Sequence, residues 1–205
     1  MRLPRCATSC AALALLLVGP AAHTAEPLSQ GADLVWGATL GAVIVKPDGL
    51  KIDAKQSMDS RASGGVLMGA RLARLPVSDG WPLYLELGYQ DIAAHTVRYK
   101  VQGMLSDLTV SGHAIALAGR LSIPLTTYLG LTTRVGVAHT QVKGSTPAGQ
   151  PAIAVSGSGT GLVHAAGLEY QFSSGPLLRG EIAGYSKTSS QSTAGAFALG
   201  MVFRF

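Results

Sequence analysis

The chain of 205 residues carries 16 Lys and Arg against 11 Asp and Glu, and only 13% of its residues are charged, against about 25% in an ordinary soluble domain. So small and scattered a positive excess excludes a dedicated nucleic-acid-binding protein. The two cysteines, Cys6 and Cys10, both lie near the N-terminus, so the rest of the chain has no disulfide, thiolate nucleophile or cysteine metal site. We expect no metal and no cofactor.

The first 25 residues have the layout of a cleaved secretory signal peptide. The basic start MRLPR is followed by the apolar stretch AALALLLVG and a small-residue exit. That run is too short to span a membrane, and no later segment offers about 18 consecutive apolar residues. We therefore expect removal of residues 1–25 and a single exported domain over residues 26–205. A hydrophobic exported chain without membrane helices can span a membrane only as a closed barrel of strands.

Eight segments of this domain alternate between large apolar and small or polar residues, with the period of two that marks a strand. In chain order, the first four lie at residues 34–44, 65–72, 81–90 and 113–123. The other four lie at residues 128–137, 162–172, 178–183 and 196–205. The pattern predicts an all-β fold, an eight-stranded antiparallel transmembrane β-barrel with an up-and-down meander.

The charged residues within the predicted strands all fall on the face that carries the small residues. This regularity predicts an apolar exterior and a polar interior, the inverse of a soluble barrel. A secreted soluble barrel remains an alternative that would have to explain it. An isolated buried charge costs several kcal/mol, so these side chains are expected to form a charge network in the lumen. Its members are Arg71, Glu86, Arg120, Arg134, Glu169, Arg179, Glu181 and Arg204.

The connections alternate in length. Long connections are expected around residues 46–63, 91–110 and 141–159, and short turns at PVSDG, PLTT and SSG. Long outer loops and short periplasmic turns are typical of bacterial outer-membrane barrels. With both chain ends periplasmic, six aromatic residues form a periplasmic girdle, and Tyr89 and Phe197 lie nearer the outer rim. The girdle residues are Trp36, Trp81, Tyr170, Phe172, Phe203 and Phe205.

The segments YLELGYQD, GLEYQF and the terminal GMVFRF resemble the OmpA/OmpX-like family of eight-stranded outer-membrane barrels, including the porin-like outer membrane β-barrel domain. The resemblance covers essentially the whole exported chain. It implies a place in the bacterial cell outer membrane. It also implies that the outer-membrane assembly machinery recognises the terminal strand, through residues matched here by Met201, Phe203 and Phe205.

Three functions are compatible with this architecture. In the first, the protein is a non-enzymatic platform with a plugged lumen, whose loops contact lipopolysaccharide, matrix or host surfaces. In the second, the inward charges line a narrow channel for ions or small solutes. In the third, outward-facing Ser111 with His113, His139 or His164 near the extracellular end catalyses a lipid modification. We prefer the platform, and we expect a monomer without nucleic-acid partners. The enzyme is the least favoured of the three, because no acid partner for a histidine is evident.

Overall fold

The computed structural model describes residues 34–47, 62–76, 80–101, 104–149, 156–173, 175–189 and 192–205. The expected signal peptide and most of the expected connection at residues 46–63 lie outside these ranges. Within them, no helix is present that is both long and apolar enough to cross a membrane.

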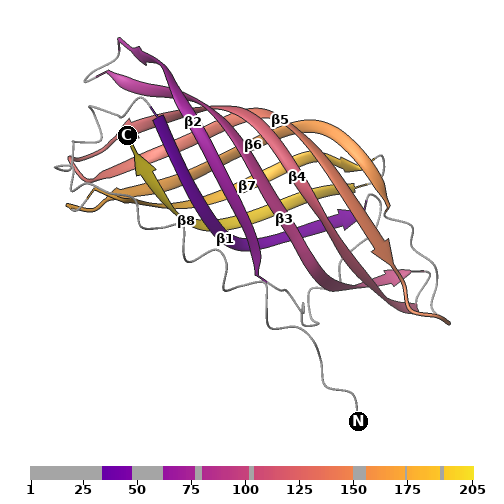
Figure 1. Ribbon diagram of the computed structural model, residues 1–205. Coiled ribbons are helices and arrows are strands. Elements are labelled where there is room, and N and C mark those ends of the chain that lie inside the picture. The colour runs from indigo at the N-terminus through magenta and orange to yellow at the C-terminus, as the bar shows by residue number, and fades with distance from the viewer. Residues whose placement is uncertain are drawn as a thin grey trace.

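Eight antiparallel strands close into a barrel in which each strand pairs with its neighbours in the sequence and the last pairs with the first (Figure 1). This confirms the predicted fold. The strands are β1 (Leu34–Pro47), β2 (Ser63–Leu75), β3 (Trp81–Val101), β4 (Met104–Pro124), β5 (Leu129–Ser145), β6 (Gly157–Gln171), β7 (Leu177–Ser189) and β8 (Ser192–Arg204).

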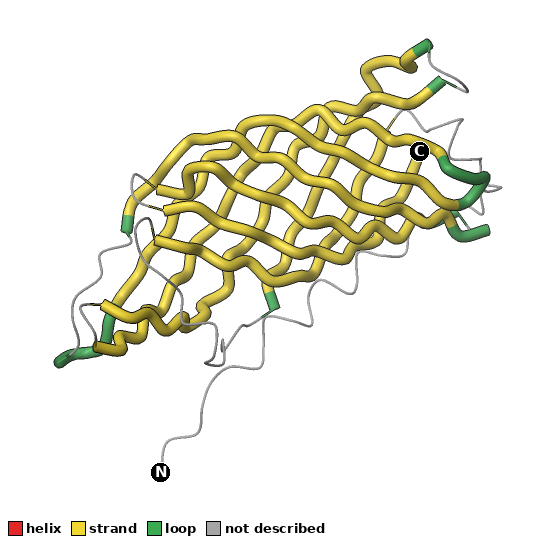
Figure 2. Tube along the Cα trace, turned by 180° about the vertical axis from the view of Figure 1, so that it is seen from behind, coloured by secondary structure: helices red, strands yellow, loops and turns green. Residues whose placement is uncertain are grey.

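The strands are staggered, which tilts them relative to the barrel axis. Paired residues can be followed around the barrel from Val35 in β1 through Glu86 in β3 and Val163 in β6, and this path returns to β1 at Val45. The ten-residue offset between Val35 and Val45 requires a strand tilt of about 40°, within the range of transmembrane barrels. Figure 2 shows the resulting slanted lattice of strands.

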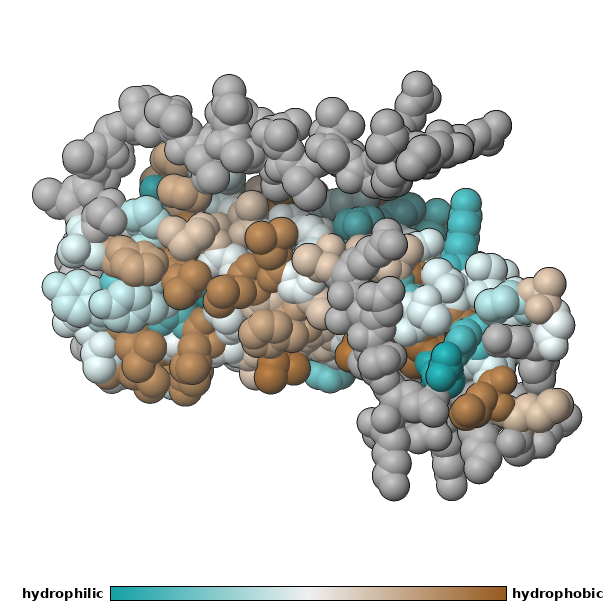
Figure 3. All heavy atoms as spheres, turned by 90° about the horizontal axis from the view of Figure 1, so that it is seen from below, coloured by the Kyte–Doolittle hydropathy of each residue, from teal (hydrophilic) through white to brown (hydrophobic). Residues whose placement is uncertain are grey.

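The outer surface is apolar because alternate side chains of each strand point away from the lumen. Leu40 is 64% exposed and Ile182 is 69% exposed, whereas Val35 and Val163 are buried. Hydrophobic residues accordingly gather on the outside of the barrel (Figure 3). Such a surface is stable only against lipid, as the alternation predicts.

The interior has two parts. Toward the extracellular end, an apolar cluster includes Val45, Ile92, Leu108 and the alanines of β4. Toward the periplasmic end, the same face of β4 continues with Arg120 and Ser122, both buried. The charged part of the lumen therefore lies in the periplasmic half.

One expected connection differs from the structure. Most of residues 91–110 belong to β3 and β4, which remain paired as far as Val101 and Met104 across a bulge between Ile92 and His95. In this hairpin the apolar side chains below the tip, such as Val97, are buried and the charged ones, such as Arg98, are exposed. The apolar face is thus reversed relative to the membrane segment, because the hairpin lies in water. The outward apolar alternation therefore stops before these strand ends, and the sequence predicted a connection there instead.

Candidate functional site

The most concentrated set of buried polar groups lies around Glu86 in the lumen. Arg120 donates from Nε to Glu86 Oε1 at 2.6 Å and from Nη1 to Glu169 Oε2 at 3.3 Å. Arg179 Nη1 donates to both carboxylate oxygens of Glu86, at 3.2 and 3.3 Å. Ser122 Oγ donates to Glu169 Oε1. These contacts link β3, β4, β6 and β7, so the network spans the barrel.

An aromatic ring supports this network from within the lumen. The guanidinium carbon of Arg120 lies 4.1 Å from the centroid of the Tyr84 ring. A cation held over a ring face in a desolvated site gains electrostatic stabilisation. Tyr84 was not among the expected site residues, although the alternation in β3 places it on the same face as Glu86. Because Tyr84 and Glu86 share a face of β3, the alternation could have predicted Tyr84 as a lumen residue.

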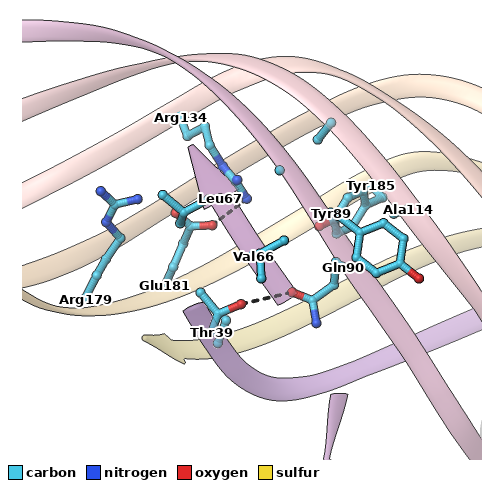
Figure 4. Close-up of a pocket in the computed structure, with 13 residues that line it drawn as sticks. Thr39, Val66, Leu67, Tyr89, Gln90, Ala114, Arg134, Arg179, Glu181 and Tyr185 are labelled. Atoms are coloured by element: carbon cyan, nitrogen blue, oxygen red, sulfur yellow. Dashed lines mark hydrogen bonds and ion pairs between the residues drawn. The ribbon is translucent and has the colours of Figure 1, made fainter. Parts of the chain in front are cut away.

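A second ion pair lies beside the first network. Arg134 Nη2 on β5 donates to Glu181 Oε1 on β7 at 2.5 Å (Figure 4). The two side chains line a cavity of about 50 Å³ together with Arg179, Thr39, Gln90 and Tyr185. Thr39 Oγ1 donates to Gln90 Oε1 at 3.4 Å across this space. The cavity has room for only a few water-sized molecules.

The remaining two expected members, Arg71 and Arg204, lie closer to the periplasmic end of the barrel. Arg71 is half-buried, next to a register shift between β2 and β3. Arg204 is half-buried too, and its Nη1 is a buried donor without an acceptor in the described part of the chain. The ion pairs found here form two groups, centred on Glu86 and on Glu181.

The outward histidines do not form a catalytic arrangement with Ser111. Lys143 lies opposite Ser111 in the register, and Gln141 lies opposite His113. Within the described ranges no hydrogen bond joins Ser111 to a histidine, and no group of three or more His, Cys, Asp or Glu side chains is placed to hold a metal ion.

The three histidines are also not level with one another. His139 shares a 2.9 Å hydrogen bond with the hydroxyl of Thr160, whereas His164 follows Thr160 by four residues toward the periplasmic end of β6. The expectation that all three lie near the extracellular end is therefore wrong for His164. Its ring lies over Gly184, where an added Cβ would come within 2.5 Å of Nε2.

Aromatic side chains gather at the end of the barrel where Leu34 meets Phe205. Trp36 stacks on Phe203 across the β1–β8 pair, with ring centroids 4.8 Å apart. Tyr170 and Phe172 meet edge to face at 5.2 Å. Trp81 begins β3 at the same end of the barrel, and Phe205 exchanges two backbone hydrogen bonds with Leu34. This ring of aromatics lies where an interfacial belt would contact lipid headgroups.

A family model described as outer membrane protein beta-barrel domain matches residues 10–205. The chain belongs to this family. As an outer-membrane β-barrel protein, it resides in the bacterial outer membrane, and the expected resemblance is confirmed.

Solved structures of other outer-membrane barrels share its fold. Ail, the attachment invasion locus protein of Yersinia pestis, superposes with a TM-score of 0.52 at 17% identity, over 85% of this chain and 99% of Ail. Neisserial surface protein A superposes with a TM-score of 0.51 at 11% identity, over 85% of this chain and 98% of that protein. No curated protein matches the chain in sequence. At these identities the likeness establishes the fold alone.

Proposed function

We propose that this outer-membrane barrel is a non-enzymatic, non-conducting platform that presents an ordered hairpin to anionic polysaccharides at the cell surface. The observation that carries the proposal is the outer part of β3 and β4. Seven residue pairs, from His95–Val110 to Val101–Met104, follow the bulge. In the described part of the chain β5 first pairs with β4 at Thr109, so the last five pairs lie beyond the register that β4 shares with β5. The hairpin therefore extends past the end of β5 at Ser145.

The hairpin is ordered by its own contacts. Arg98 binds Asp107 through two parallel hydrogen bonds, at 2.5 Å from Nε and 2.9 Å from Nη2. Burial of Val97 and Leu108 anchors its base in the interior cluster. A binding element that is ordered beforehand loses less conformational entropy when it meets a partner.

The end of the hairpin offers apolar surface to a partner. Met104 is 55% exposed and Leu105 is 45% exposed. Cationic residues lie in the sequence of the same hairpin, at Arg98 and Lys100, and in the sequence between β1 and β2, at Lys51 and Lys55. This mixture of apolar and basic residues supports binding of a sulfated or phosphorylated sugar. The relative Ail has been crystallised with the heparin analogue sucrose octasulfate, which makes heparin a suitable probe.

The filled lumen supports the non-conducting part of the proposal. The ion pairs around Glu86 reach across the periplasmic half, and the apolar cluster fills the extracellular half. A hydrated path through the barrel would have to open both layers. Outside the barrel, the positions of Ser111 and the histidines support a non-enzymatic function.

Two measurements on the native barrel, refolded in lipid, test the proposal. In planar bilayers we expect a silent membrane with the barrel shown to be inserted. We also expect saturable binding of heparin by surface plasmon resonance. Replacing Arg98–Asp107 by a two-residue Asn-Gly turn between Val97 and Leu108 is expected to weaken heparin binding at least tenfold. A matched control shortens the connection between β5 and β6 on the same side of the membrane.

The two measurements test the non-conducting lumen and the binding hairpin separately. Discrete conductance steps in the native barrel that change with Arg120→Ala and Glu169→Ala would show that the protein is a narrow channel and not a platform. Equal heparin affinity in the native and hairpin-shortened proteins would show that the hairpin does not contribute to binding.

The terminal strand is part of the same proposal, as the segment recognised during assembly. We expect deletion of Phe205 to reduce insertion into the outer membrane of living cells. Refolding of the purified variant into vesicles is expected to change less, because no assembly machinery takes part there. Equal insertion in cells would remove Phe205 from this role.

A further inference from the structure

The small cavity in the lumen lies where the charged and apolar parts of the interior meet. Arg134, Glu181 and Arg179 line one side, and Ala114 and Tyr185 line the other (Figure 4). Its volume is about 50 Å³. A site of this size with polar walls can hold a small ion or a few waters, but not a sugar or a nucleotide.

The two arginines at this cavity have buried hydrogen-bond donors that the glutamates do not use. Arg134 Nε and the Nε and Nη2 atoms of Arg179 are buried and have no acceptor in the described part of the chain. Arg179 is only 3% exposed, so these groups are shielded from bulk water. Glu181 Oε1 already accepts from Arg134 Nη2, and Gln90 Oε1 accepts from Thr39. Three guanidinium donors are thus left for something else to satisfy.

The charge of the buried network has the same sign as this excess of donors. Arg179 already pairs with Glu86, so the charge is counted over the whole network. Four buried or half-buried arginines accompany three buried glutamates there: Arg120, Arg134, Arg179 and Arg204 against Glu86, Glu169 and Glu181. Uncompensated positive charge in a low-dielectric interior is costly, and an anion removes both the charge and the donor imbalance, whereas water removes only the second.

We propose that the lumen binds one small monovalent anion of halide size between the guanidinium groups of Arg134 and Arg179. The anion accepts hydrogen bonds from the edges of the two guanidinium groups that the glutamates leave unused. Glu181 stays paired with Arg134, and it limits the site to a single negative charge. The site belongs to the lumen and is independent of what the outer hairpin binds.

A direct test uses crystals of the native barrel grown in bromide. We expect an anomalous scattering peak within hydrogen-bond distance of Arg134 Nε and Arg179 Nε. Density for water alone at this place, with no anomalous signal, would overturn the proposal. Because the native protein is used, the test does not depend on the folding of a variant.

A solution test compares thermal unfolding at constant ionic strength in chloride and in gluconate, an anion too large for the cavity. We expect chloride to raise the Tm saturably by at least about 3 °C. Arg179→Gln is expected to abolish the difference between the two salts, and Arg98→Gln, on the outer hairpin, to preserve it. Equal Tm values for the native barrel in both salts would contradict the proposal. Neither result affects the heparin measurement.

Discussion

Arg120 and Glu86 form a 2.6 Å ion pair inside the barrel, and each residue is only 1% exposed. They lie on adjacent strands but are not opposite each other, because Tyr84 is the register partner of Arg120 and Ala118 that of Glu86. The diagonal contact leaves Glu86 able to accept from Arg179 as well. One carboxylate thereby joins two cations from opposite sides of the lumen.

Removal of Arg120 should destabilise the barrel strongly. In Arg120→Met, Glu169 loses its arginine and Glu86 keeps only Arg179, so we expect a loss of about 3–5 kcal/mol in the free energy of unfolding. Urea titration of the refolded protein in vesicles, followed by tryptophan fluorescence, measures this loss. The double variant with Glu86→Gln should lose less than the sum of the two single variants. A change below about 0.5 kcal/mol in Arg120→Met would mean that the pair contributes nothing.

Gly41 is needed where β1 closes on β8. A Cβ at this position would lie within 2 Å of the carbonyl oxygen of Phe197 and 2.8 Å from the Cα of Ala198. Gly41→Ala therefore forces the two strands apart, and overpacking of this kind costs about 1–3 kcal/mol. We expect a lower folded fraction on unheated gels. Gly64→Ala is the control, since an added Cβ there meets nothing within 4 Å; equal folding of both variants would contradict the clash.

Arginine substitutions on the outer surface of the barrel test where the membrane lies. Leu117 points outward near the middle of β4, paired with Leu87 and Val137. Leu117→Arg is expected to cost about 2–4 kcal/mol, because an arginine at the bilayer midplane is poorly solvated. Leu125, in the turn after β4, is also exposed, and Leu125→Arg should cost only about 0–1 kcal/mol at the membrane surface. Equal losses in the two variants would place the membrane elsewhere.

Acid should loosen the outer hairpin. The hydrogen bond from Arg98, with its positive charge, holds the pKa of Asp107 below the ordinary value of 3.8. The pair thus stabilises the hairpin fully above that value, and the contribution is lost as the pH falls through the lower pKa of the folded state. An NMR titration of the Asp107 carboxyl group follows this change. In Arg98→Gln the pKa should return toward 3.8, with the Tm of the barrel little changed; identical titrations would show that the pair is not maintained in solution.

The sequence predicts the strands and the face of each side chain best where lipid covers the barrel. In β4, Ala114, Ala116 and Arg120 are inward, as the alternation requires. The same rule fails beyond Asp91, because water replaces lipid and the polar face turns outward. It also places His164 too close to the extracellular end. The position of a residue along the barrel axis depends on the stagger between strands, which no single strand encodes.

The choice of partners inside the lumen lies beyond the sequence. Alternation places the arginines and glutamates in one interior. It does not predict that Glu86 forms ion pairs with two arginines while Glu181 pairs with Arg134. That choice depends on the register between strands and on side-chain rotamers. The small cavity depends on the same details of packing, so it could not be predicted either.

The seam between β1 and β8 has a consequence for the order of folding. In the described part of the chain β1 pairs with β8 at thirteen positions, from Val35–Arg204 to Pro47–Ser192, and with β2 at eight. Its main support among the described strands therefore comes from β8, which leaves the ribosome after the other seven. Joining such distant segments has a high entropic cost and is slow, while neighbouring hairpins form early. Any partly formed sheet that lacks β8 therefore leaves β1 as an edge strand that is open to pairing with other chains until β8 joins it.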